Sequence, residues 1–249
     1  MRIEVLPALV DNYAYLAWDG DVAAAIDPPE AGVVLSALQK TGARLAAVLV
    51  THHHADHTGG CLALKQATGC VIAGPADARV PTIERPLRDG EVFRAGPVEV
   101  QAIAVPGHTR SHLAFFSRAW NAVWTGDTLF CAGCGRLLEG TPEQMWASLQ
   151  LLRSLPEPTR VYCGHDYTVD NLEFAAELEP ANREVADRLK GTRMLSAGGA
   201  ASVPSTIGLE KLTNPFLRCD APALQRAIGM SGAAPAAVFA EVRRRKDNW

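Results

Sequence analysis

The stretch Thr51–His57, with the sequence THHHADH, decides how the rest of the chain is interpreted. It directly follows an apolar run, Leu45–Val50 (LAAVLV), which is typical of a buried strand. The side chains in it that can bind a metal ion are those of His52, His53, His54, Asp56 and His57. Dense groups of histidine and aspartate are typical of metal sites, whereas buried core histidines occur singly because each needs a hydrogen-bond partner. A loop can direct these side chains toward two nearby points, which predicts a site for two cations.

Three further positions repeat one local pattern, in which a potential ligand follows a strand and a glycine. They are His108 in VPGHT, Asp127 in TGDTLF and His165 in YCGHDY. Each is a weak signal alone, because a lone Gly-Asp is usually a turn. Loops at one edge of a sheet sandwich converge, so we expect these three residues to join the donors of the loop 51–57. A donor set of nitrogen and oxygen atoms without thiolates suits zinc, iron or manganese.

Longer phrases of the sequence resemble one family of the metallo-β-lactamase superfamily, the hydroxyacylglutathione hydrolases or glyoxalases II. The phrases are VLPALVDNY (5–13), THHHADHTGG (51–60), TGDTLFCAGCGRLLEGT (125–141), RVYCGHDYTVDNL (160–172), VPST (203–206), NPF (214–216) and RRRKD (243–247). The H-x-H-x-D-H pattern is shared across the superfamily and many chemistries. The phrases around residues 127–135, 162–168 and 243–247 are much more specific, and the similarity runs along the whole chain.

The resemblance implies an α/β fold, namely an αββα sandwich followed by a smaller all-helical C-terminal domain. We expect the metal hydrolase domain to span residues 1–165 and the helical substrate-binding domain residues 166–249. The resemblance also implies two divalent metal ions per chain, with zinc expected and iron or manganese as alternatives. It assigns His52, His54 and His108 to one ion. It assigns Asp56, His57 and His165 to the other, with Asp127 bridging both, and it leaves His53 out of the ligand set.

The activity that the resemblance implies is hydrolysis of S-(2-hydroxyacyl)glutathione, above all S-D-lactoylglutathione, to glutathione and D-lactate. This is the second step of methylglyoxal detoxification. A hydroxide held between two cations would attack the thioester carbonyl, and one cation would polarise the carbonyl oxygen. The catalytic residues are then the seven expected ligands. No Gly-x-Ser-x-Gly segment is present, which disfavours a serine nucleophile.

The carboxylates of a glutathione thioester call for cationic and hydrogen-bonding side chains beside the metals. The family pattern places such residues at Arg136, Tyr167, Arg243 and Lys246. By itself, the basic run that contains the last two is more typical of a solvated helix end, which complements the helix dipole, and only the match of the whole phrase to the family favours substrate binding.

Two positions depart from the family pattern. Where the family has two aromatic residues before Glu-Gly-Thr, this chain has Leu137 and Leu138, so the hydroxyl donor expected at position 138 is missing. Asp166 stands where glutamate is usual. The first departure concerns substrate affinity and leaves the metal chemistry unaffected.

Composition excludes several classes of partner. The chain has 249 residues with a net charge of −3, which argues against a general attraction to nucleic acid. Its longest apolar run, Leu45–Val50, is far shorter than the ~18 residues that cross a bilayer. The N-terminus does not resemble a signal peptide, and six cysteines are too few for a disulfide scaffold. We therefore expect a cytoplasmic monomer whose partner is a small-molecule glutathione thioester, with no nucleic acid and no membrane.

Four other functions remain as alternatives. A mononuclear iron persulfide dioxygenase of the same superfamily would lack the complete second ligand set, and another thioesterase would share both sets. A nucleic-acid phosphodiesterase would need a broad basic surface, which a pI near 6.2 disfavours. A non-catalytic binding module would be expected to have lost ligands.

Along the chain, the pattern predicts a strand-rich region to about residue 165. Helices are then expected at about 170–178, 181–189, 221–228 and 235–246, with a loop formed by Gly198-Gly199 and the segment 202–206.

Overall fold

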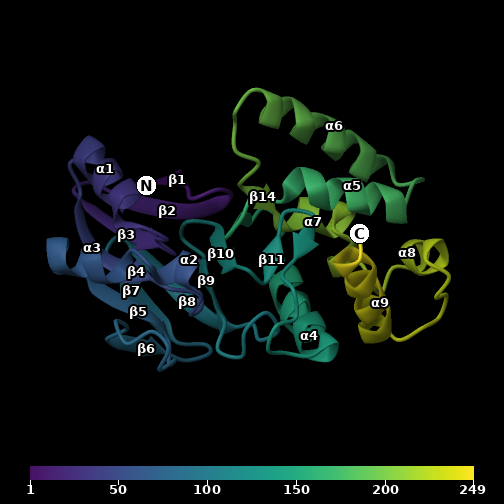
Figure 1. Ribbon diagram of the computed structural model, residues 1–249, viewed down its shortest axis with the longest axis horizontal. Helices are drawn as coiled ribbons and strands as arrows, with labels where there is room; N and C mark the ends of the chain where they lie inside the picture. The colour runs from purple at the N-terminus through teal and green to yellow at the C-terminus, as the bar shows by residue number, and fades with distance from the viewer. The chain divides into compact units, whose positions relative to one another are not determined.

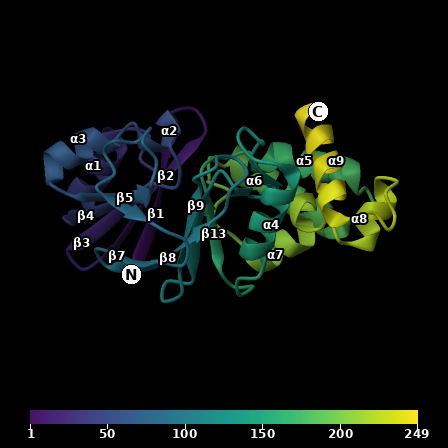
Figure 2. The same cartoon turned by 90° about the horizontal axis from the view of Figure 1, so that it is seen from below.

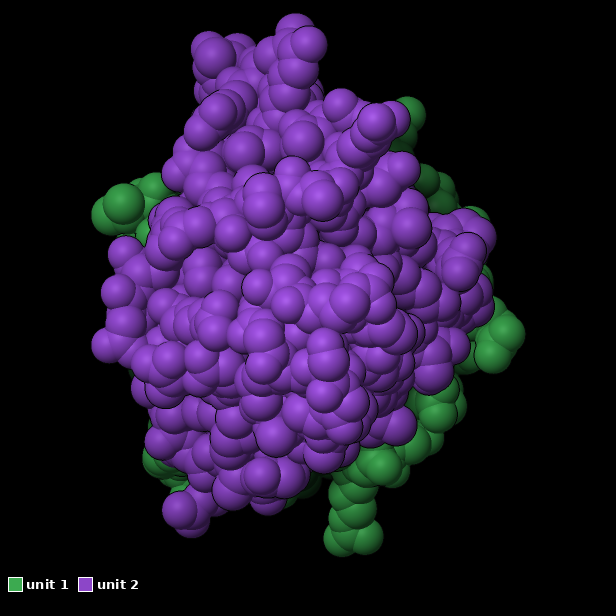
Figure 3. Space-filling model, turned by 90° about the vertical axis from the view of Figure 1, so that its right-hand side faces the viewer, with its two compact units in different colours: residues 1–104, 111–126 green, residues 105–110, 127–249 purple.

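The computed structural model describes residues 1–249, which divide into two compact units. Unit 1 comprises residues 1–104 and 111–126, and unit 2 comprises residues 105–110 and 127–249 (Figure 3). The predicted domain boundary at residue 165 falls within unit 2 and stays a prediction.

The first sheet of unit 1 has six strands, in the order in which they occur along the chain. They are β1 (Arg2–Ala8), β2 (Asn12–Asp19), β3 (Val22–Ile26), β4 (Arg44–Leu49), β5 (Val71–Pro75) and β6 (Arg85–Leu87). The strands β1, β2 and β3 pair antiparallel, whereas β3 to β6 pair in parallel. Parallel neighbours need crossover connections, and helices supply two of them.

These crossover helices are α1 (Ala31–Thr41) and α3 (Cys61–Thr68). The buried face of α1 contains Val34 and Leu38, and α3 buries Leu64, all within one core cluster with residues of β4 and β5. Both helices end at a glycine in the left-handed region, Gly42 (φ 71°) and Gly69 (φ 69°). Glycine adopts this conformation without a Cβ penalty and so terminates the helix. Figure 1 shows α1 and α3 beside the strands of this sheet.

The other strands of unit 1 form an antiparallel meander. They are β7 (Val92–Ala95), β8 (Val98–Ala104), β9 (Leu113–Ser117) and β10 (Ala122–Gly126). Every residue of β9 and β10 is buried, so both faces of these strands are covered. Within unit 1, β7 contacts β4 of the first sheet, which gives the two β layers of a sandwich. The strand-rich region that the sequence predicts is therefore present.

Unit 2 is mainly helical, with two short strand pairs. Its strands are β11 (Leu129–Phe130) with β12 (Gly133–Cys134), and β13 (Arg160–Cys163) with β14 (Ser205–Thr206). Its helices are α4 (Pro142–Arg153), α5 (Thr168–Leu178), α6 (Arg183–Ala197), α7 (Ile207–Thr213), a 3-10 turn (Pro215–Leu217), α8 (Pro222–Ala227) and α9 (Pro235–Asp247). The helix α4 contacts α7 and α9 (Figure 2). Thr141 and Gln144 form a capping box at the start of α4.

The structure differs from the sequence pattern in the segment after residue 181. The helix α6 continues to Ala197, and Ser205–Thr206 forms a strand paired with Arg160–Val161 rather than part of a loop. The helix α6 buries only Val185 and Thr192, so its apolar periodicity is too weak to mark its end. No helix of the structure is both long enough and apolar enough to cross a membrane.

Candidate active site

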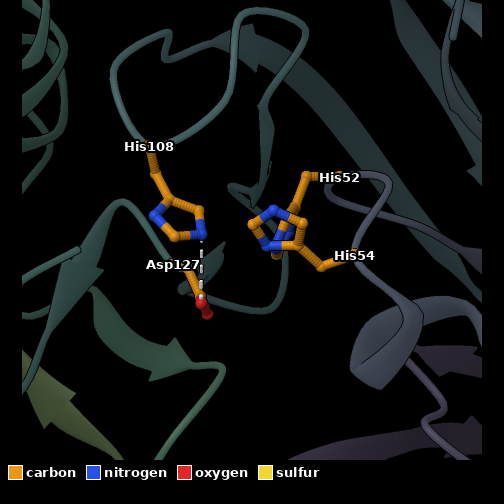
Figure 4. Close-up of side chains that lie close together, drawn as sticks. All are labelled: His52, His54, His108 and Asp127. Carbon is orange, nitrogen blue, oxygen red and sulfur yellow. Dashed lines mark hydrogen bonds and ion pairs between the residues drawn. The ribbon is translucent and has the colours of Figure 1, made fainter. Parts of the chain in front are cut away.

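The donor loop, residues 51–57, leaves the buried strand β4 and enters the single-turn helix α2 (Ala55–Thr58). His52 and His57 are buried, and His54 is half-buried. The Nδ1 atom of His52 lies 3.0 Å from Thr51 Oγ1, and its Nε2 atom lies 2.9 Å from His54 Nδ1. One nitrogen of each imidazole thus lies beside the other ring, and the second nitrogen of His52 contacts Thr51. The two rings meet edge to face, with centroids 4.6 Å apart and 78° between their planes (Figure 4).

Asp27 anchors this loop, and the sequence analysis missed it. Its buried carboxylate accepts hydrogen bonds from the Thr51 backbone N–H (2.7 Å) and the Thr51 hydroxyl (2.6 Å). A carboxylate oxygen also lies 3.1 Å from His57 Nδ1. A carboxylate at one ring nitrogen fixes the tautomer and orientation of a histidine whose other nitrogen binds a metal. The only signal in the sequence was an aspartate at a strand end before Pro28-Pro29, which reads as a turn.

Asn12 holds Asp56 in place, as Asp27 does His57. From the start of β2, its Nδ2 donates to Asp56 Oδ2 (3.1 Å) and to the Asp56 carbonyl (3.2 Å). The asparagine is buried, so these bonds fix the rotamer of a half-buried carboxylate. The sequence showed Asn12 only as part of the phrase DNY, with no indication of its partner.

Unit 2 contributes His108, Asp127 and His165, all buried. The Oδ2 atom of Asp127 lies 3.5 Å from His108 Nε2 and 3.4 Å from His165 Nε2. The Nδ1 atom of His108 lies 2.9 Å from the carbonyl of Arg136, which leaves Nε2 directed at Asp127. Figure 4 shows the contact between His108 and Asp127. One carboxylate oxygen therefore stands beside two histidines that come from different loops.

The potential ligands form two groups. His52, His54, His108 and Asp127 make up one, and Asp56, His57 and His165 make up the other. Within each group, the donor atoms lie within 4.8 Å of one another. Both groups offer only imidazole nitrogens and carboxylate oxygens, a donor set that suits borderline divalent cations. His53 lies outside both groups, with its Nδ1 3.8 Å from Asp77 Oδ2.

A cavity of about 610 Å³ in unit 2 has His108 and Asp127 in its wall. All four residues expected to bind substrate also line it: Arg136, Tyr167, Arg243 and Lys246. The Tyr167 ring stacks on His165, with centroids 5.0 Å apart and 4° between the planes. Leu138 is 58% exposed on the wall, where the family pattern has a tyrosine. Cations and potential metal ligands thus face the same space.

Arg243 is firmly held in the cavity wall. It is buried on α9, donates to the Cys134 carbonyl (3.0 Å) and to Asp247 Oδ1 (3.0 Å), and its guanidinium lies 5.1 Å from the centre of the Phe216 ring. Burial raises the pKa of the neighbouring Cys134 thiol to about 11, although the positive charge of Arg243 opposes that shift. Cys134 is therefore a neutral packing residue at physiological pH.

Lys246 lies one turn further along α9, and its side chain is only 9% exposed. Its ammonium group donates to Asp170 Oδ2 (2.5 Å) and to the Asp170 carbonyl (3.2 Å). It also lies 4.0 Å from the centre of the Trp249 ring. Burial lowers the pKa of Lys246, and the carboxylate of Asp170 counteracts this effect.

Comparison with known proteins places the chain in a family. Residues 12–165 match the metallo-β-lactamase superfamily, and residues 166–249 match the hydroxyacylglutathione hydrolase C-terminus. A hydroxyacylglutathione hydrolase of Methylococcus capsulatus is 48% identical over 251 residues, covering 99% of this chain and 98% of that protein.

Two solved structures extend the comparison. ETHE1 from Myxococcus xanthus aligns with a TM-score of 0.70 and 25% identity, covering 98% of this chain and 90% of that one. TTHA1623, solved in a di-iron-bound form, aligns with a TM-score of 0.62 and 29% identity, covering 87% of this chain and 100% of that one. These matches confirm the predicted fold class, to which the structure adds the short strand β14 in the otherwise helical C-terminal region. The chain belongs to the hydroxyacylglutathione hydrolase family of the metallo-β-lactamase superfamily.

Proposed function

We propose that the protein hydrolyses S-(2-hydroxyacyl)glutathione, with S-D-lactoylglutathione as its reference substrate. The observation that carries this proposal is the composition of one cavity wall. Asp127, which contacts histidines of both donor groups, lines the same cavity as Arg243 and Lys246. A hydrolytic centre and a site for carboxylates therefore open onto the same space, as a thioester of an anionic tripeptide requires.

The ligand assignment is part of the proposal. His52, His54 and His108 would hold one metal ion, Asp56, His57 and His165 the other, and Asp127 both. The grouping of the donor atoms supports this division, as does the place of Asp127 Oδ2 between His108 and His165. When bound, two cations lower the pKa of water and polarise a carbonyl oxygen, which supplies a nucleophile at neutral pH. Zinc is the metal we propose, and iron is the main alternative because a relative carries two iron ions.

The protein's own groups prepare this centre. Asp27 fixes the ring of His57 and the backbone of Thr51, and Asn12 fixes Asp56, so the donors need little rearrangement on metal binding. Arg243 and Lys246 attract the substrate's carboxylates, and Arg136 and Tyr167 extend the binding surface. Because the tripeptide does not change during the reaction, these contacts stabilise the bound substrate and the transition state alike.

The remaining parts of the proposal concern organisation and location. We assign hydrolysis to residues 1–165 and most of the substrate binding to residues 166–249. We also propose a cytoplasmic monomer. The cysteines support a reducing compartment, because all six are buried free thiols.

The direct test is hydrolysis of S-D-lactoylglutathione by protein loaded with zinc or with iron. The loss of the thioester is recorded over time. A coenzyme A thioester and glutathione persulfide, the latter with oxygen uptake recorded, serve as alternative substrates. We expect rapid hydrolysis of the glutathione thioester, slow hydrolysis of the coenzyme A thioester and no oxygen uptake. Oxygen uptake with the persulfide, without thioester hydrolysis, would identify the protein as a dioxygenase instead.

A further inference from the structure

Trp249 lines the proposed substrate cavity, although neither the sequence pattern nor the proposed function gives it a part. Its ring centre lies 4.0 Å from the ammonium nitrogen of Lys246. At this distance, the ring face attracts a cation, and tryptophan does so more strongly than tyrosine or phenylalanine. The ring therefore forms one side of the space in which the Lys246 charge resides.

Trp249 is itself fixed by two contacts in unit 2. Its indole N–H donates to Glu177 Oε2 at 2.6 Å. Its ring also meets the buried Phe174 edge to face, with centroids 5.8 Å apart. The Lys246 nitrogen lies 5.2 Å from the Phe174 ring as well. The two rings form an aromatic corner, and its position is set by α5, to which both Glu177 and Phe174 belong.

The two cavity cations on α9 differ in what holds them. Arg243 has a backbone carbonyl, the Asp247 carboxylate and the Phe216 ring as partners, so it needs no help from Trp249. Apart from the aromatic corner, the Lys246 ammonium group has the carbonyl and the carboxylate of one residue, Asp170, whose side chain is 59% exposed. A lysine has a flexible four-carbon stem and a strongly hydrated head, so without the ring its ammonium group would have more freedom to turn toward solvent.

We propose that Trp249 is a positioning residue for Lys246, holding the ammonium group in the cavity wall where it meets a carboxylate of the substrate. That the ligand is a glutathione thioester rests on the proposed function. The placement of Lys246 by Trp249 rests on the contacts alone. Trp249 thereby contributes to the selection of substrates that carry a carboxylate, without touching the reacting atoms.

A double-mutant cycle tests the proposal through KM and kcat for S-D-lactoylglutathione. We expect Trp249→Ala to raise KM by about 3- to 10-fold, the range expected for losing one cation–π contact, with kcat nearly unchanged. In a Lys246→Ala background, the same substitution should have no further effect on KM. Trp249→Phe keeps a ring below the ammonium group and should restore most of the affinity. Leu195→Ala, which removes a half-exposed side chain of α6 outside the cavity, is the matched control.

An equal rise in KM with and without Lys246 would overturn the proposal, because Trp249 would then act on the fold or on the substrate directly. An unchanged KM in Trp249→Ala would overturn it too. In both cases, the hydrolytic function would stand as long as the wild type cleaves the thioester.

A second measurement does not depend on the substrate. Reductive methylation followed by mass spectrometry reports how accessible the Lys246 amine is, and we expect slow modification in the wild type and in Trp249→Phe. Modification should be several times faster in Trp249→Ala and unchanged in Leu195→Ala. Equal rates in Trp249→Ala and the wild type would show that the ring does not hold Lys246.

Discussion

The functional side chains of the donor loop in unit 1 and of the cationic cavity in unit 2 are held in place by different kinds of contact. In the donor loop, seven consecutive residues contain five potential ligands, and buried polar groups such as Asp27 hold them. In the cavity, the cations come from separate segments, and carbonyls, aromatic rings and partly exposed carboxylates hold them. The potential ligands of the loop can thus be recognised from consecutive residues in the sequence, whereas the residues of the cavity are brought together only by the fold. Substitutions in the first region should abolish chemistry, and those in the second should change affinity.

The largest effect is expected for Asp127→Ala. The carboxylate contacts His108 and His165, one from each donor group, so its loss should disturb both metal positions. We expect kcat to fall by more than about 1,000-fold, because both nucleophile generation and oxyanion stabilisation depend on these positions. Elemental analysis should show reduced metal content. Asp187→Ala, at an exposed site of α6, is the control. A folded Asp127→Ala variant with two ions and near-native turnover would show that Asp127 is not the bridge.

Asp27→Asn tests whether metal affinity depends on the residue that holds the donor loop as well as on the potential ligands themselves. The amide keeps the shape of the side chain but removes the charge beside His57. We expect metal affinity to fall by about 10- to 100-fold, as for other groups that orient metal ligands. Chelator competition measures this, with Asp21→Asn at an exposed turn as the control. Native affinity in a folded Asp27→Asn protein would mean that the loop is rigid without this contact.

In the cavity, Arg243→Ala and Lys246→Ala should both raise KM but differ in stability. Under the proposed function, each substitution removes a charge-assisted contact with the substrate, and we expect KM to rise about 10-fold or more while kcat is largely retained. Arg243→Ala should also lower Tm, because Arg243 holds the Cys134 carbonyl and packs on Phe216. Lys246→Ala should leave Tm nearly unchanged. An S-acyl thiol without carboxylates serves as the control substrate. Equal KM changes for this substrate would show that the basic helix end is only a solvated terminus.

The smallest effect is expected for Leu138→Tyr. Position 138 is exposed on the cavity wall, so a tyrosine can be accommodated and would restore the hydroxyl donor of the family pattern. We expect KM to fall by about 3-fold, the size of one ordinary hydrogen bond. Leu138→Phe separates the hydroxyl from the ring. If both variants lower KM equally, the aromatic surface and not the hydroxyl is what this chain lacks.

The comparison of the two regions also explains what the sequence could predict. Strand patterns indicated an α/β region followed by helices, and the density of histidine and aspartate identified the candidate ligands. The αββα fold class and the division of these ligands into two groups came from the resemblance to the glyoxalases II. Asp27 was missed because its partners, Thr51 and His57, lie 24 and 30 residues away. Trp249 was missed because the residue that fixes its indole ring, Glu177, lies 72 residues away in the sequence. Residue types thus indicate which side chains can bind a metal ion, whereas the residues that hold those side chains in place are distant in sequence and are seen only in the structure.

The central claim, a hydrolase with two metal ions and a shared carboxylate, is tested most directly by titrating metal-free protein with zinc while recording S-D-lactoylglutathione hydrolysis. The account predicts that activity rises until two equivalents per chain are bound and then stays constant, and that Asp127→Ala shows no such rise. Full activity at one equivalent, with no change on adding the second, would contradict it.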